Sequence, residues 1–460
     1  MLLIGLILYV VAQFAIGVWV SRRTATEADY ILAGRSLGAP LIAFSVFATW
    51  FGAEAIVATT GEVYKNGLGG ALIDPFAYAG AVMLSGLLFA AVLWRNGLTT
   101  FADLFARRYS PAIEKLVVLV LLPGSIFWAA AQIRAFGQVL GSSSGLDLWL
   151  AITIAAVLVG AYTTIGGLLA DAITDFVQSI VVISGLVLLA LVVAARSGGF
   201  GAVLGAVEPG HLSVFTGGDG SALEKLEHVV VAVCGSLVAV ELISRYLGAR
   251  SADVARAGTL AGGAIYLAVG LIPVFLGLAA SVLAAGDPAL AAKLGDSEQI
   301  VATLAQHYMP TIGYVLFAGA IVSAILSNVH SSLHAPAAQV SHNIMAHLLP
   351  DLDGVGRLRL VRGTVLVLSI VAFALALASE RIKDLVELAS AFGSAGVFVT
   401  ACFAIFTRIG GPASAGAAIL TGVGLWAAGR FALGWTAPYI VALIGSTLAY
   451  LGVAWWQTRR

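Results

Sequence analysis

Residues Ser323–His334 read SAILSNVHSSLH and continue the uncharged apolar run GYVLFAGAIV, so the sequence predicts one long helix with a polar face. At helical spacing, five of the polar side chains fall within an arc of about 100°. These five are Ser323, Ser327, His330, Ser331 and His334. Polar groups inside a membrane are costly unless they face a cavity, an ion or a partner helix. We therefore expect a functional site on this face.

The rest of the chain has the composition of a membrane protein. Of its 460 residues, 60% are hydrophobic and only 10% are charged, whereas about 25% of the residues of a soluble domain are charged. The predicted fold class is therefore an all-α polytopic membrane protein embedded in a lipid bilayer. The formal net charge is zero, which gives no support to a nucleic-acid partner, and no pattern indicates an oligomeric state.

Neither the cysteines nor the first residues point to another class of protein. Cys234 and Cys402 lie in apolar segments, and no disulfide framework or metal motif accompanies them. The N-terminal MLLIGLILYVVAQFAIGVWVSRR lacks a positively charged start and a small-residue cleavage site. We interpret it as a retained first helix rather than a removed signal peptide.

Apolar runs long enough to cross a bilayer recur along the whole chain, since a span needs about 20 mostly apolar residues. Thirteen are expected: 2–20, 38–60, 69–93, 113–141, 146–165, 172–196, 226–247, 257–285, 311–347, 361–379, 384–407, 412–431 and 437–456. Loops on one side would hold 16 of the 24 Lys and Arg residues, and loops on the other side 7. The richer side should be cytoplasmic. This predicts an external N-terminus and a cytoplasmic C-terminus.

Two of the expected spans are interrupted in a similar way. The second contains FGAEA around Gly52, and the seventh contains CGSLVAVE around Gly235. Each combines small residues with an acidic one. Paired interrupted helices in two halves of a chain indicate a transporter site near the middle of the membrane.

Five segments resemble, in order and spacing, the sodium:solute symporter family, which includes proline, sialic acid and sodium/glucose transporters. They read DYILAGRSLGAP, FGAEAIVATTGEVYKNG, GGLLADAITDFVQS, ELISRYLGARS and AILSNVHSS, and the resemblance runs from about residue 28 to 407. It implies a leucine-transporter-type fold of two inverted five-helix repeats, at 38–196 and 226–407. A single transmembrane domain, 1–460, would add one helix before the repeats (2–20) and two after them (412–456).

The resemblance also implies a sodium site between the second and ninth spans. The matching positions are Ala53, Ile56, Ala324, Ser327 and Asn328. Sodium would be the coupling ion, held by carbonyl and hydroxyl oxygens of unwound helices. Asn328 departs from the serine or threonine usual in the family, although an amide oxygen can also bind a hard cation.

A second ion or proton pathway is implied at Asp175, His330 and Ser331, together with Ser327. His330 replaces a hydroxyl residue of the family and titrates near neutral pH. We therefore expect proton relay with Asp175 rather than a second sodium ion there. The alternative for Asp175 is a helix-capping role with Thr174.

Candidate substrate-binding residues are Glu54, Gln132, Arg134 and Glu241. Arg134 is the one basic residue well inside an expected span, and its guanidinium could bind a substrate carboxylate with two hydrogen bonds. The alternative is an ion pair with one of the two glutamates. Arg245 lies at the cytoplasmic end of the seventh span, where the positive-inside rule accounts for it, and a gate role is the alternative.

These observations predict a secondary active transporter, in a cell membrane that we expect to be the bacterial inner membrane. It would couple sodium to uptake of a small polar solute, such as an amino acid or organic acid, by alternating access. One alternative is proton coupling through Asp175 and His330. Another is a symporter-like sensor module, although the chain stops at WWQTRR without a cytoplasmic domain. An enzyme is not expected, because the Ser/His stretch lacks a nucleophile elbow or metal motif.

Overall fold

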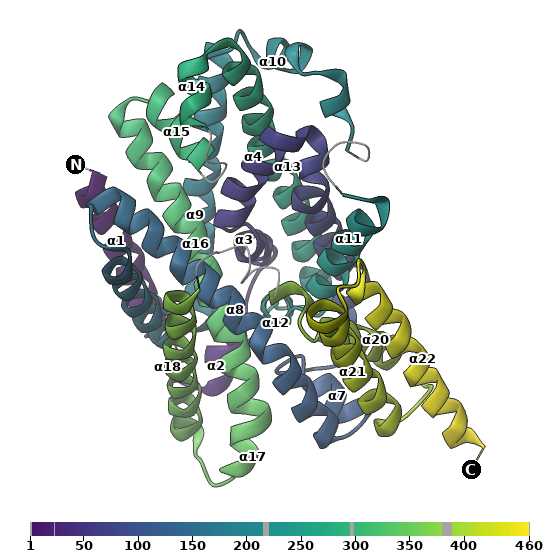
Figure 1. Cartoon of the computed structure of the whole chain (residues 1–460). Helices are drawn as coiled ribbons and strands as arrows, with labels where there is room; N and C mark the ends of the chain where they lie inside the picture. Colours follow the sequence, from purple (N-terminus) through teal and green to yellow (C-terminus); the bar gives the residue numbers. More distant parts are fainter. Residues whose placement is uncertain (1, 23, 215–219, 295–298, 380–388, 460) are drawn as a thin grey trace.

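The computed structural model describes residues 2–22, 24–214, 220–294, 299–379 and 389–459, and within them the regular elements are helices (Figure 1). The first half contains α1 Leu2–Ser21, α2 Glu27–Leu32, α3 Ala39–Trp50, α4 Ala53–Asn66, α5 Tyr78–Ser85, α6 Ala91–Arg95, α7 Asp103–Arg108, α8 Pro111–Ser144, α9 Leu148–Arg196 and α10 Phe200–Ala206. The second half contains α11 Ala222–Leu237, α12 Val240–Leu247, α13 Ala252–Gly286, α14 Pro288–Lys293, α15 Ile300–Tyr308, α16 Thr311–Gln339, α17 Ala346–Leu348, α18 Gly354–Ala378, α20 Ser394–Phe406, α21 Pro412–Ala427 and α22 Pro438–Thr458.

Short 3₁₀ or π segments join or extend several of these helices. They are η1 Ala33–Arg35, η2 Gly67–Ala71, η3 Leu72–Ala77, η4 Gly86–Ala90, η5 Pro209–Leu212, η7 Val340–Met345 and η8 Ala428–Leu433. η3 contains Asp74, whose φ of −122° and ψ of 117° depart from helical values.

Among the described residues, ten helical stretches are long and apolar enough to cross a membrane. The expected number of thirteen is therefore not confirmed as such. The fifth and sixth expected spans are one element, α9, broken at Gly167. Gly167 has a φ of +75°, and a Cβ there would lie 2.9 Å from the Tyr30 ring, so this close turn requires glycine. The first expected span corresponds to α1, and the second is divided between α3 and α4.

Both expected interruptions are present. The first lies at Phe51 and Gly52, between α3 and α4. The second lies at Val238 and Ala239, between α11 and α12, so Gly235 itself remains helical. Figure 1 places the short helices α3 and α12 in the middle of the molecule, with longer helices around them. The two breaks therefore occur in the core of the bundle.

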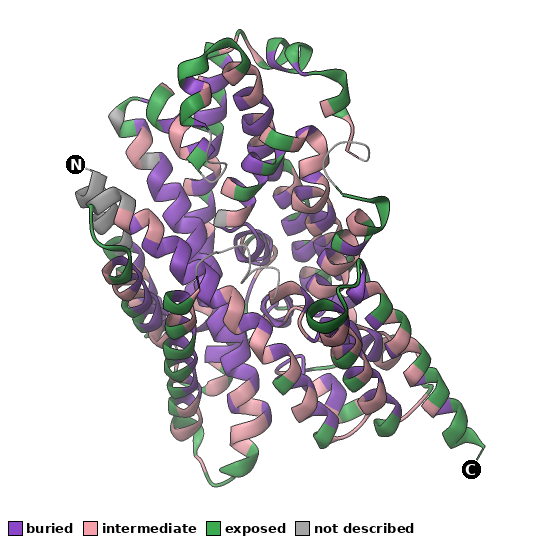
Figure 2. Cartoon of the chain, in the orientation of Figure 1, coloured by how far each residue is buried: buried purple, intermediate pink, exposed green. Residues whose placement is uncertain are grey.

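Burial divides the helices into inner and outer ones. α16 is buried along most of its length, whereas α18 and α22 have exposed outer sides (Figure 2). The exposed residues of α18 include Leu366, Val367 and Ile370, as expected for a helix that contacts lipid. α13 approaches α3 through Gly258 and Gly262, where added Cβ atoms would lie within 2.7 Å of Ile42 and Val46. This close packing holds the first broken helix at the centre.

Candidate ion and substrate sites

The break after α3 exposes backbone oxygens that a continuous helix would use. Within a helix the Ala48 carbonyl would accept the N–H group of the residue four positions on, which is Gly52. At the break the Gly52 N–H group instead donates to the Trp50 carbonyl, at 3.1 Å. The Ala48 oxygen is thereby available to another partner, as is usual for carbonyls in the last turn of a helix.

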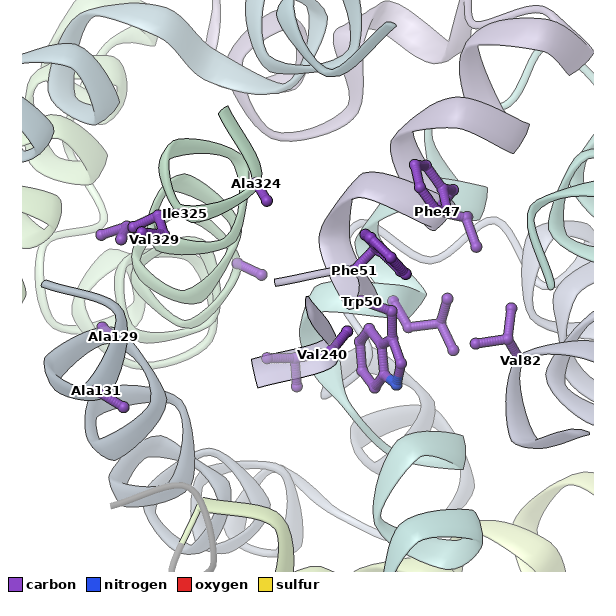
Figure 3. Close-up of a cluster of buried hydrophobic side chains, with 14 of the residues drawn as sticks. Phe47, Trp50, Phe51, Val82, Ala129, Ala131, Val240, Ala324, Ile325 and Val329 are labelled. Atoms are coloured by element: carbon purple, nitrogen blue, oxygen red, sulfur yellow. The ribbon is translucent and has the colours of Figure 1, made fainter. Parts of the chain in front are cut away.

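That partner is Asn328 of α16. Its Nδ2 donates to the Ala48 oxygen at 3.0 Å and to the Ala324 oxygen at 2.9 Å. Its Oδ1 is buried and has no hydrogen-bond partner among the described residues. Figure 3 shows Ala324 on the side of α16 that faces Phe47 and Phe51, whereas Ile325 and Val329 point to the opposite side. The polar side of α16 therefore meets the end of α3.

The geometry favours Ala48 over Ala53 and Ile56 as the residue of the broken helix whose carbonyl oxygen would bind sodium. Ala53 and Ile56 lie in the first turn of α4, where carbonyls point into the body of the helix and pair with N–H groups further along. The Ile56 oxygen also accepts the Thr60 hydroxyl, at 2.8 Å. The assignment of Ala53 and Ile56 as sodium ligands stays a prediction, and Ala48 is the better-placed oxygen.

Ser327 is the third expected residue of this site on α16, and it leads to a buried charged cluster. Its hydroxyl donates to Asp175 Oδ1, and the Ser45 hydroxyl donates to Asp175 Oδ2 at 2.6 Å. Asp175 lies well inside α9, which argues against its helix-capping alternative. Thr174 hydrogen-bonds the Ala170 and Asp171 carbonyls of its own helix.

The centre of the charged cluster is an ion pair between Arg245 and Asp171, which are both almost fully buried. The guanidinium also lies 3.8 Å from Asp175 Oδ2, donates from Nε to the Thr49 hydroxyl at 2.9 Å, and donates to the Ser331 hydroxyl. The interpretation of Arg245 as a cytoplasmic anchor is therefore wrong, because its side chain is 1% exposed. It joins α12 to α9, α3 and α16.

His330 lies in this cluster, but beside a different acid from the expected one. Its Nδ1 is 2.9 Å from Asp171 Oδ2, so its described partner is Asp171 rather than Asp175. The sequence interpretation missed Asp171, although it stands four residues before Asp175 on the same helical face in GGLLADAITD. The proposed ion or proton pathway through Asp175, His330 and Ser331 stays a prediction.

A cavity lies between the two helix breaks. Its walls come from α3, α4, η3, α5, α8, α11, α12, α13 and the start of α20. The larger lining side chains are mostly aromatic or acidic, and the others are small or aliphatic. The larger ones include Trp50, Tyr78, Trp128, Tyr266, Phe392, Glu54, Asp74 and Glu241. Trp50 and Trp128 meet edge to face, with ring centroids 5.1 Å apart.

Each carboxylate of the cavity accepts a hydrogen bond from a neutral side chain. Glu54 accepts Gln132 Nε2 at 2.7 Å, and Glu241 accepts the Ser125 hydroxyl at 2.5 Å. Asp74 accepts the Tyr266 hydroxyl at 2.9 Å. No Lys, Arg or His stands among the described residues that line the cavity. The acidic residues here thus lack a basic side chain within the described lining.

Glu54 and Glu241 occupy matching places, because each is the second residue of the helix after a break. A carboxylate is favoured in the first turn of a helix, where backbone N–H groups are free. The Glu54 carboxyl folds back over Gly52, and a Cβ at Gly52 would lie 2.5 Å from it. A larger residue at Gly52 would therefore require the Glu54 carboxyl to move.

Arg134 is placed apart from the other predicted substrate residues. It is not among the described residues lining the cavity, and its Nη1 donates to the Ala376 carbonyl of α18 at 3.0 Å. Gln132 contributes indirectly, through its hydrogen bond to Glu54. The structure brings Glu54, Gln132 and Glu241 around the cavity, whereas Arg134 faces another helix. A carboxylate clamp by Arg134 is not favoured by this geometry.

Comparison with known proteins agrees with this architecture. The sequence model of the sodium:solute symporter family matches residues 30–421. The chain belongs to the sodium:solute symporter family. This confirms the resemblance, and the ten long apolar helical stretches among the described residues agree with a multi-pass membrane protein. The orientation of the termini and the boundaries of the two repeats stay predictions.

Relatives in the family carry different solutes by name. The high-affinity choline transporter 1 of Caenorhabditis elegans is 32% identical over 196 residues, which cover 40% of this chain and 34% of the relative. The sodium-coupled monocarboxylate transporter 1 of Xenopus laevis is 25% identical over 424 residues, covering 90% of this chain and 65% of the relative. The chain thus spans about a third of the length of that choline relative.

The fold itself has been seen in a solved structure. A Na⁺-coupled sialic acid symporter in a substrate-bound, outward-open state superposes with a TM-score of 0.86 at 17% identity, covering 99% of this chain and 98% of that one. This confirms the leucine-transporter-type fold class.

Proposed function

We propose that this protein is a sodium-coupled symporter that carries a small organic cation into the cytoplasm. The observation that carries the substrate class is the cavity between the two helix breaks. Glu54, Asp74 and Glu241 supply acidic groups there, and aromatic rings surround them. Aromatic faces and carboxylates attract a positively charged group, and aromatic cages are a common means of binding quaternary ammonium ions.

The same cavity disfavours an anionic substrate. A carboxylate-bearing solute needs a basic partner, and the described lining contains no Lys, Arg or His. Buried like charges destabilise each other unless a counter-ion is present. Of the two solute classes named for the relatives above, choline and monocarboxylates, the cavity supports the cation. This replaces the amino acid or organic acid expected from the sequence.

Residues at the meeting of α3 and α16 fit a sodium ion. The Ala48 and Ala324 carbonyls approach one nitrogen, and a hydroxyl is supplied by the neighbouring Ser327. The unpartnered Oδ1 of Asn328 is a further buried oxygen. Carbonyls freed by a helix break are the usual ligands of sodium in transporters of this type. We assign Ala48, Ala324, Ser327 and Asn328 to the sodium site.

Both proposed sites share one broken helix, which provides a route for coupling. Ala48 faces α16, whereas Trp50 and Glu54, just beyond it, line the cavity. An ion that fixes the end of α3 would also fix Trp50 for the substrate. If sodium raises the affinity for the cation, the cation must raise the affinity for sodium by the same factor. Each positive charge that enters also gains about 2.3 kcal/mol per 100 mV of membrane potential.

The test is uptake of radiolabelled choline into proteoliposomes that contain the purified protein. We expect uptake with an inward sodium gradient and none when potassium replaces sodium. Unlabelled choline should compete, whereas propionate should not. Uptake in sodium-free buffer that rises with external acidity would instead support the proton-coupled alternative. Competition by propionate without choline transport would contradict the substrate class.

A matched pair of variants tests the cavity directly. Glu241→Gln keeps the shape of the lining and removes one negative charge, whereas Glu208→Gln removes a charge from an exposed residue outside the lining. We expect only the first to weaken choline binding. Equal choline affinity in both variants would show that the cavity carboxylate does not bind the solute.

A further inference from the structure

The amide of Asn328 occupies the place where an ion would join α3 to α16. Its Nδ2 lies 3.0 Å from the Ala48 oxygen and 2.9 Å from the Ala324 oxygen. The residue is 1% exposed, so water does not have free access to the group. One N–H₂ group thus bridges two backbone oxygens that belong to different helices.

Electrostatics requires a positive group at this point. Both carbonyl oxygens carry partial negative charge. The Ala324 oxygen lies inside α16, where a backbone N–H group can pair with it, whereas leaving the buried Ala48 oxygen at the end of α3 without a partner would be costly. A donor N–H or O–H group or a cation can lie between them, but an acceptor-only oxygen such as the amide Oδ1 cannot. In the absence of an ion, the amide must therefore present its nitrogen to Ala48 and Ala324.

The opposite orientation is required once an ion is bound. A hard cation between the Ala48 and Ala324 oxygens repels the N–H₂ group and attracts an oxygen. The Oδ1 atom has no hydrogen-bond partner among the described residues, so turning the amide breaks only the two Nδ2 hydrogen bonds to Ala48 and Ala324, which the ion would replace. Exchange of Nδ2 and Oδ1 needs only a half-turn of the terminal amide, a torsion with broad preferences.

We propose that Asn328 is an internal competitor of the sodium ion. In the ion-free protein its N–H₂ group links α3 to α16 through Ala48 and Ala324. Sodium displaces this group, the amide turns over, and Oδ1 becomes a ligand. This inference rests on the proposed sodium site, and it adds that Asn328 raises the sodium concentration needed and holds the ion-free helices together.

A shorter side chain would not act in this way. A serine at position 328 would still offer a hydroxyl oxygen, but it is too short to bridge both carbonyls as the amide does. An aspartate would keep the shape of asparagine and replace the N–H₂ group by oxygen. Serine loses the bridge to the Ala48 oxygen and keeps a hydroxyl ligand, whereas aspartate removes the donor and adds a negative charge, so the two variants test the competition by different chemistry.

The experiment measures sodium binding to the detergent-solubilised protein without substrate. The thermal unfolding midpoint is followed as NaCl replaces KCl at a constant total salt concentration. We expect Asn328→Ser and Asn328→Asp each to lower the half-effective sodium concentration, by about fivefold for one lost hydrogen bond. Ser332→Ala is the control, because the Ser332 hydroxyl bonds only the Val329 carbonyl of its own helix among the described residues. Ser332→Ala should leave the half-effective sodium concentration unchanged.

Hydrogen exchange of the α3 break provides a second readout. In sodium-free KCl, the wild type should protect the Phe47–Gly52 backbone, and Asn328→Ser should lose part of this protection and regain it with sodium. The Ser332→Ala variant should behave as wild type. A residue with a purely structural role would lose protection with and without sodium.

The outcomes separate this inference from the proposed function. A sodium response in the wild type, with an unchanged or higher half-effective concentration in both Asn328 variants, would overturn the competition and leave the symporter proposal standing. Should Asn328→Ser fail to fold, Asn328→Asp decides alone by the same criterion. A wild type without any sodium response would overturn both.

Discussion

Two groups of acidic side chains in the described interior of this protein differ in what balances their charge. Asp171 and Asp175 of α9 surround the guanidinium of Arg245, and we call these three residues the arginine cluster. The cavity carboxylates, Glu54, Asp74 and Glu241, accept hydrogen bonds from neutral Gln132, Tyr266 and Ser125. In the arginine cluster the protein supplies the cation itself, which gives a structural ion pair. The cavity carboxylates have no basic partner in the described lining, so they remain available to a cationic substrate.

The largest expected effect is loss of the built-in counter-ion. Replacing one partner of a buried ion pair leaves the other charge uncompensated, which costs about 3–5 kcal/mol. We therefore expect Arg245→Gln to destabilise the protein by that amount, measured by thermal or denaturant unfolding in detergent. The exposed Arg250 offers a matched control, and Arg250→Gln should have almost no effect.

A double variant sharpens this prediction. Arg245→Gln combined with Asp171→Asn removes both members of the pair, so it should recover part of the stability lost in Arg245→Gln alone. A double variant that is less stable than the single one would show that Asp171 does not depend on Arg245 for its compensation.

The second effect concerns the cavity carboxylates. Glu241→Gln removes a charge that we expect the substrate cation to neutralise. A hydrogen bond or contact with a charged group contributes about 1.5–3 kcal/mol, so choline affinity should fall by about 10- to 150-fold. Stability should hardly fall, or should rise, because an uncompensated acid is removed. Isothermal titration with choline in sodium buffer and an unfolding curve measure the two quantities, and a strong loss of stability would place Glu241 with the arginine cluster.

A smaller effect is expected for the aromatic wall. Trp128 packs edge to face on Trp50 and lines the cavity. A cation over an aromatic face contributes about 0.5–2 kcal/mol. Trp128→Leu should therefore weaken choline binding by about 2- to 30-fold, and Trp128→Phe should recover part of the loss because an aromatic face is restored. If leucine and phenylalanine gave the same affinity, the ring would contribute only volume.

The comparison also explains what the sequence could and could not predict. The breaks at Gly52 and near Gly235 were predictable, because small residues beside an acid are visible in the local pattern. Ser327 was predictable as a polar residue on one face of an apolar helix, whereas Asn328 was identified through the resemblance to the family. The pairing of Arg245 with Asp171 was not, because it depends on how two distant helices pack.

The register of the first broken helix shows the same limit. The motif FGAEAI located the break but not which carbonyls it frees, since that depends on the direction in which each helix half pairs its N–H groups. The hydrogen bond from Gly52 to Trp50, which leaves the Ala48 oxygen to Asn328, appears only in the folded chain. The role of Arg134 stays a prediction for a related reason, because a lone charge in an apolar segment does not reveal which neighbour it faces.

The smallest expected effect is the one that separates the two solute classes most sharply. Arg134 donates to the Ala376 carbonyl and lies outside the described lining of the cavity. Arg134→Lys keeps the charge and loses the fork-shaped guanidinium that binds carboxylates with two hydrogen bonds. For a cationic substrate we expect choline affinity to change by less than about twofold, which corresponds to a few tenths of a kcal/mol. A clamp on a substrate carboxylate would lose far more, because the planar geometry would be gone. Binding measured on folded protein, with the unfolding midpoint as a check, distinguishes the two, and a large loss would return the substrate to the carboxylate class.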